Sequence, residues 1–201
     1  MPVVGRGEFT TLAADAQTAS WSESDVIPAE WMPLSGNLLA GLVGAINGAT
    51  AGSNYATSDT SVLTDSTVPS EGGAAYIVGF QNNSAIEWAF GKPMTLDQIR
   101  LSACYLAGTS FSRLAVAGIS VKTEGSDAWA ALDVPALSDI SGRNGGVVIC
   151  ASLTDPENGF LAENAVGLKI AFGNSGALAS YCAEIEAVGH PSVDPTIVVF
   201  R

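Results

Sequence analysis

The chain is poor in charge, and most of the charge that it has is negative. Charged residues make up 14% of its 201 residues, and eight lysines and arginines stand against twenty aspartates and glutamates, for a formal net charge of −12. Nucleic acids and anionic membranes are bound through basic patches, so this composition argues against both as partners. It is compatible with neutral sugars, with cations or with a basic protein.

Cysteine and histidine are also scarce. The three cysteines, Cys104, Cys150 and Cys182, are odd in number and widely spaced, so we expect buried thiols rather than a disulfide framework or a zinc site. The single histidine, His190, lies beside a proline, and the sequence contains no nucleophile elbow, phosphate loop or dinucleotide fingerprint. We therefore expect a protein that is not an enzyme. A pair of carboxylates acting on a glycosidic bond stays open, because it is defined by separation in space.

Long apolar runs are missing as well. The longest, from Leu38 to Ile46, is interrupted by two glycines and falls short of the roughly twenty residues that a membrane span needs. The first residues do not show the cationic start and apolar block of a secretory signal. We expect no membrane insertion, and we leave localisation open, with an extracellular surface or a virion favoured.

What the chain does have is short stretches of alternating apolar residues. Ile86, Trp88 and Phe90 lie two apart, and the alternation resumes at Ile99 after residues 91–93, where Gly-Lys-Pro is expected to break the strand. Short strands separated by glycine-rich turns predict an all-β sandwich. Within residues 113–123 the apolar phase slips by one residue, which predicts a β-bulge at Ala117-Gly118. Residues 124–127, Glu-Gly-Ser-Asp, predict a hairpin turn.

The stretch Ile-Glu-Trp-Ala-Phe-Gly-Lys-Pro-Met-Thr-Leu-Asp-Gln-Ile-Arg-Leu at residues 86–101 resembles the centre of discoidin-like (coagulation-factor C-type, galactose-binding-like) domains. Residues 37–41 resemble the family's opening strand, and three further segments follow the family's order: 62–66, 112–129 and 181–189. The resemblance implies an antiparallel jelly-roll β-sandwich over residues 37–189. It also implies a non-catalytic module that binds glycans or other surfaces.

Two segments flank this expected domain. Residues 1–36 are expected to form an arm that packs through Trp21 and Trp31 onto the domain or a neighbour, or else a simple N-terminal strand with a loop. Residues 190–201 read as a linker and a strand-prone tail, which either pairs with another chain or adds a strand to its own sheet. These segments favour protein partners or a homo-oligomer. They also support an alternative function, a structural virion protein such as a phage capsid decoration or tail component.

A cation site is the first candidate for chemistry. Glu184 and Glu186 are two apart on an expected strand, so their carboxylates share one face, where they either flank a cation or are solvated. The resemblance implies a structural calcium ion held by Asp65 and Glu184, with backbone carbonyls around Thr64 and Thr67 completing the oxygen ligands. The chain departs from the family's pattern at residue 66, where serine replaces the usual glycine, and it lacks the acidic residue that often follows.

A ligand surface is the second candidate. The resemblance places it on the loops at one end of the sandwich, and sugar recognition needs an aromatic platform together with planar polar groups. The candidate residues that combine these properties are Tyr76, Phe80, Asn82, Asn83, Phe111, Arg143 and Asn144. For Phe80 and Phe111 a core or interface position is the favoured alternative, and Tyr76 could be an ordinary strand residue.

Overall fold

The structure is a computed structural model, and it describes residues 6–13, 33–50, 58–66, 78–81, 83–104, 113–141, 148–173 and 180–192. These residues form strands β1 (Glu8–Ala13), β2 (Ala45–Asn47), β3 (Val78–Phe80), β4 (Ala85–Cys104), β5 (Arg113–Thr123), β6 (Trp129–Ala131), β7 (Leu137–Ser141), β8 (Val148–Thr154), β9 (Ala162–Phe172), β10 (Ser180–Cys182) and β11 (Glu184–Pro191). The one helical element that they contain is a 3-10 turn, η2 (Thr60–Leu63). No described helix is long and apolar enough to cross a membrane.

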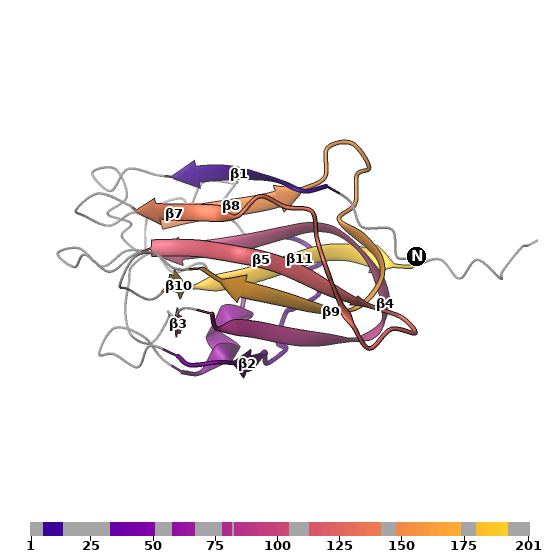
Figure 1. Cartoon of the computed structure of the whole chain (residues 1–201), viewed down its shortest axis with the longest axis horizontal. Helices are drawn as coiled ribbons and strands as arrows, with labels where there is room; N and C mark the ends of the chain where they lie inside the picture. The colour runs from indigo at the N-terminus through magenta and orange to yellow at the C-terminus, as the bar shows by residue number, and fades with distance from the viewer. Residues whose placement is uncertain are drawn as a thin grey trace, which may run out of the picture.

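Strand β4 joins two groups of strands, because its neighbours change along its length (Figure 1). Its first half pairs with β2 and β9, and β9 continues to β5, which pairs with β6 and β7. Its second half pairs with β11 and β8, and β8 continues to β1. All of these pairs are antiparallel, and the apolar side chains of both groups are buried in one core. The expected all-β antiparallel sandwich is therefore confirmed.

The expected break at residues 91–93 is wrong, because β4 remains extended through it. What changes there is the pairing: the register with β9 shifts between Ala89 and Met94. Pro93 has no N–H to give to a ladder, so it is tolerated where the partner strand is out of register. A second irregularity follows, since Val188 pairs with Gln98 but Gly189 pairs with Leu96. This bulge shifts the alternation by one residue.

The β-bulge and the hairpin turn are both confirmed. Val116 pairs with Phe172 and Gly118 with Ala171, so one extra residue, Ala117, lies on the β5 side of the ladder. β5 and β6 are antiparallel, and the turn between them contains Gly125 at a φ of 75°. That left-handed backbone is accessible to glycine at no steric cost.

The N-terminal expectations need correction. Residues 37–41 form turns rather than the family's opening strand. They are fixed to β11 by Asn37, whose side-chain oxygen accepts hydrogen bonds from the backbone N–H groups of Leu39 and Ala187. β1 is an edge strand against β8, so part of the expected arm takes the alternative form of a strand on the domain.

The C-terminal linker was expected to begin at His190, and the structure moves this boundary. β11 continues through His190 and Pro191, which pair with Thr95 and Met94, so the strand extends two residues into the expected linker. Residues 193–201 lie outside the described residues, as do Trp21 and Trp31.

The core places one cysteine and two phenylalanines at the centre of the molecule. Cys182 is fully buried and its thiol donates to the Ser102 carbonyl, which confirms the expectation of a buried thiol there. The rings of Phe80 and Phe172 are stacked, with centroids 3.9 Å apart and planes 9° from parallel. Stacked rings add to the free energy already gained by burying them.

The turn after β8 depends on Asp155. Its carboxylate accepts hydrogen bonds from the backbone N–H groups of Glu157, Asn158 and Arg6 and from the Asn158 side chain. The bonds from Asn158 hold the pKa of Asp155 below its ordinary value.

We expect Asp155→Ala to lower the melting temperature by about 5 °C, measured by calorimetry near neutral pH, while the exposed neighbour Glu157→Ala changes it little. The difference in melting temperature between the parent and Asp155→Ala should shrink as the pH falls through the lowered pKa of Asp155. A difference that stays constant with pH would contradict this role of the carboxylate.

Candidate functional site

Several strand ends meet at one end of the sandwich (the left in Figure 1). The start of β5 lies beside the end of β7, because Arg113 pairs with Ser141. The end of β4 lies beside the start of β8, because Cys104 pairs with Val148. These four strand termini therefore lie at the same end of the sandwich. We call it the loop end.

The short β3–β10 pair closes the loop end between the two groups of strands. The Ser180 hydroxyl donates to the backbone carbonyl of Ala115 on β5 and accepts from the N–H of the same residue. At the other end of β10, the N–H of Ala183 donates to the carbonyl of Ser102 on β4. β3 pairs with β10 over its whole length, so β3 also belongs to the loop end.

Most of the predicted ligand residues lie outside the described residues: Tyr76, Asn82, Phe111, Arg143 and Asn144. Each is within three sequence positions of a described strand end, namely those of β3, β5 and β7. These strand ends themselves lie at the loop end.

The two described candidates differ in accessibility. Phe80 is fully buried in its stack on Phe172, which is the core alternative that the sequence left open. Asn83 is exposed in the β3–β4 turn at a φ of 63°, a left-handed backbone that asparagine tolerates better than most residues. Gln81 is also exposed in this turn, and its side-chain amide donates to the backbone carbonyl of Thr50.

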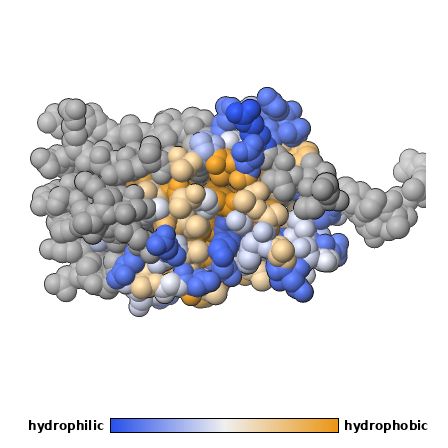
Figure 2. Space-filling view, viewed as in Figure 1, coloured by the Kyte–Doolittle hydropathy of each residue, from blue (hydrophilic) through white to orange (hydrophobic). Residues whose placement is uncertain are grey.

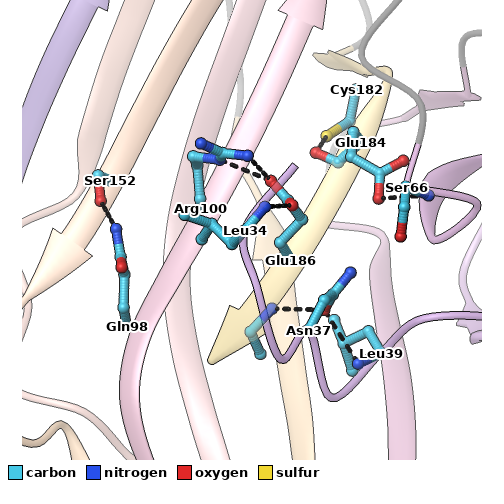
Figure 3. Close-up of polar contacts among 11 residues, drawn as sticks. Leu34, Asn37, Leu39, Ser66, Gln98, Arg100, Ser152, Cys182, Glu184 and Glu186 are labelled. Carbon is cyan, nitrogen blue, oxygen red and sulfur yellow. Dashed lines mark hydrogen bonds and ion pairs between the residues drawn. The ribbon is translucent and has the colours of Figure 1, made fainter. Parts of the chain in front are cut away.

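The predicted acidic pair lies elsewhere, on β11, and the structure excludes the solvated alternative. Glu184 is 1% exposed and Glu186 is 0% exposed. Glu186 is compensated: it accepts from Arg100 Nε at 2.6 Å, forms an ion pair with the same guanidinium and accepts from the Leu34 N–H at 2.6 Å (Figure 3). Arg100 faces Glu186 directly across the β4–β11 ladder, and sequence reasoning missed this partner.

Glu184 is not compensated to the same extent. One carboxylate oxygen accepts from the N–H of Ser66 at 3.2 Å, and the other, Oε2, is buried without a hydrogen-bond partner (Figure 3). Burial, together with the negative charges of Glu186 and Asp65, raises the pKa of Glu184 to about 9. Ser66 itself has a φ of 63°, which explains why the resemblance leads one to expect glycine at this position.

The residues around Glu184 fit a hard cation in their chemistry. Asp65 lies close enough to act on the Glu184 carboxyl by charge and by hydrogen bonding, and the unpartnered Oε2 is an oxygen ligand of the kind that calcium prefers. Among the described residues, no group of three or more histidine, cysteine, aspartate or glutamate side chains is arranged as a metal site. Within the described part of the chain, further ligands would come from backbone carbonyls.

Comparison with known proteins gives structural likenesses only. No family model matches the sequence, and no curated protein matches it. One similar solved structure is chitosan-binding module 1 from a chitosanase/glucanase of Paenibacillus sp. IK-5, with 14% identity, a TM-score of 0.46 and coverage of 76% of this chain and 98% of that one. Another is CpGH89CBM32-5 from Clostridium perfringens, in complex with GalNAc-beta-1,3-galactose, with 10% identity, a TM-score of 0.46 and coverage of 72% and 94%.

Proposed function

We propose that the chain is a non-catalytic binding module that recognises a glycan, or a similar surface, through its loop end. The observation that carries the proposal is the convergence there of the ends of β3, β4, β5, β7 and β8, whose adjoining segments contain the candidate ligand residues. A rigid sandwich that presents several loops at one end is a common arrangement for recognition.

The residue types at the loop end suit a sugar. Tyr76 and Phe111 would supply an aromatic platform for the apolar face of a pyranose ring. Asn83, Arg143 and Asn144 would supply planar donors and acceptors for its hydroxyl groups. With a net charge of −12, the chain favours a neutral or cationic ligand over an acidic one.

The proposal includes a structural calcium ion beside β11. Asp65 and Glu184 would hold it, and its positive charge would offset the buried Glu184 carboxylate and the exposed Asp65 carboxylate beside it. Its role is structural, because it would tie the segment after η2 to β11. Ligand recognition remains with the loop-end residues.

Loop-end substitutions test the proposal. We expect the full chain to bind members of a glycan array, and we expect Tyr76→Ala and Arg143→Ala each to weaken that binding at least about tenfold with an unchanged melting temperature. Glu157→Ala, an exposed position in the turn after β8, is the matched control and should bind as the parent does. An array that stays empty with and without calcium would remove the glycan proposal.

The alternative of a structural virion protein depends on the arm tryptophans and the tail strand, which the structure does not describe. No feature within the described ranges favours it, so we do not propose it.

A further inference from the structure

Trp129 extends across the outer face of the strands β4, β9, β5 and β6, away from the loop end. It stands on β6 opposite Lys122 of β5, which in turn pairs with Gly167 of β9. A Cβ atom placed on Gly167 would lie 3.3 Å from Cη2 of the indole, so the ring reaches over β5 as far as β9. Trp129 is half-buried, and part of its indole therefore remains open to solvent.

A donor and an acceptor border the indole. The Lys169 ammonium lies over the Trp129 ring, 5.6 Å from its centroid, and 3.1 Å from the Glu87 carboxylate, so it covers part of the indole and leaves the rest for a ligand. Both charged side chains are 27% exposed, so their remaining hydrogen-bonding positions reach solvent. They come from directly paired positions on β4 and β9, and the ion pair fixes one relative to the other.

The surroundings of this cluster are open and locally neutral. A Cβ atom on Gly118, in β5, would have no atom within 4 Å, so the space directly above that residue is open. The second lysine on the face, Lys122, lies 3.2 Å from Asp127, so the two cations are matched by two carboxylates. Figure 2 shows hydrophilic and hydrophobic residues side by side in the middle of this face. This neutrality contrasts with a chain whose net charge is −12.

We propose that this face is a second sugar-binding surface, which takes a neutral pyranose chain on the Trp129 indole. The apolar face of one ring would contact the indole, while Glu87 accepts from and Lys169 donates to hydroxyl groups at the ring's edge. Because the charges are paired, the face offers no net attraction to an acidic polysaccharide or to a polyamine. The proposal goes beyond the loop-end site and does not depend on it.

The test is an NMR titration of the full chain with cellohexaose, xylohexaose and β-1,4-galactohexaose. The signal of the Trp129 indole N–H is identified by its loss in Trp129→Phe. We expect at least one hexasaccharide to shift this signal below about 10 mM, and Glu87→Gln and Lys169→Met each to weaken the effect about tenfold. Both variants change partly exposed side chains, and their melting temperatures confirm that they fold.

Arg143→Ala separates this face from the loop end, because it removes a candidate of the loop end alone. The indole shift should be unchanged in that variant. An indole signal that no hexasaccharide moves would overturn the proposal and leave Trp129 as packing for the hairpin. A shift that disappears in Arg143→Ala would also overturn it, since the sugar would then be bound at the loop end.

Discussion

Arg100→Met is expected to destabilise the protein by about 3–5 kcal/mol. Arg100 and Glu186 are 3% and 0% exposed, and the guanidinium is the cation that faces this carboxylate across the β4–β11 ladder. Removing the guanidinium leaves the negative charge of Glu186 buried. Among the described residues, the Leu34 N–H is the group that still donates a hydrogen bond to this carboxylate. The cost arises from this uncompensated charge more than from the loss of the pair itself.

Urea unfolding of Arg100→Met and of the double variant Arg100→Met/Glu186→Gln measures this effect. The double variant should recover a large part of the loss, because glutamine is neutral and its side-chain oxygen can still accept from Leu34. Lys122→Met removes a partly exposed ion pair and should change stability by less than about 1 kcal/mol. A similar small change in Arg100→Met would contradict the account of this pair.

The second large effect concerns Glu184. Its pKa is raised from 4.5 to about 9, so between these values the native state holds a proton that the unfolded chain has released. The corresponding stability is present below the unfolded pKa and is lost as the pH rises through the folded one. In chelator, we expect the melting temperature to fall by at least about 5 °C between about pH 5 and pH 9. Glu184→Gln should flatten this dependence.

Calcium should reverse the loss of stability that follows ionisation of Glu184. A cation bound to the ionised carboxylate stabilises the native state by about 2.7 kcal/mol at a concentration one hundred times its dissociation constant, which corresponds to about 5–10 °C near pH 8. Asp65→Asn and Glu184→Gln should each abolish the shift, whereas Asp155→Asn, far from the site in sequence, should keep it. Identical melting temperatures of the parent with calcium and with chelator would remove the metal from the account.

Local sequence patterns were sufficient for much of the fold. The slip in apolar phase before Ile119 located the bulge at Ala117, because a buried ladder can absorb an extra residue only by unpairing it. The composition of residues 124–127 located the hairpin. The resemblance predicted that Asp65 and Glu184 lie close together, although they are more than a hundred positions apart in the sequence.

Burial of the acidic pair could not be predicted in this way. A period of two shows that Glu184 and Glu186 share a face, but it does not say what covers that face. The covering groups are Leu34 and Ser66, which are 152 and 118 positions away from the carboxylates that they contact. Arg100 was within a recognised motif, yet its role depends on the register of β11 against β4, which no local pattern specifies.

The central claim is that a sugar binds at the loop end, and a backbone NMR map tests it most directly. The full chain is titrated with the strongest glycan from the array, and the amides that shift are located on the fold. The account predicts shifts at Asn83 and at the strand ends Cys104, Arg113 and Ser141, with Gly159, in the turn between β8 and β9, unaffected. Shifts confined to the hairpin end, or no shift with any glycan, would contradict it.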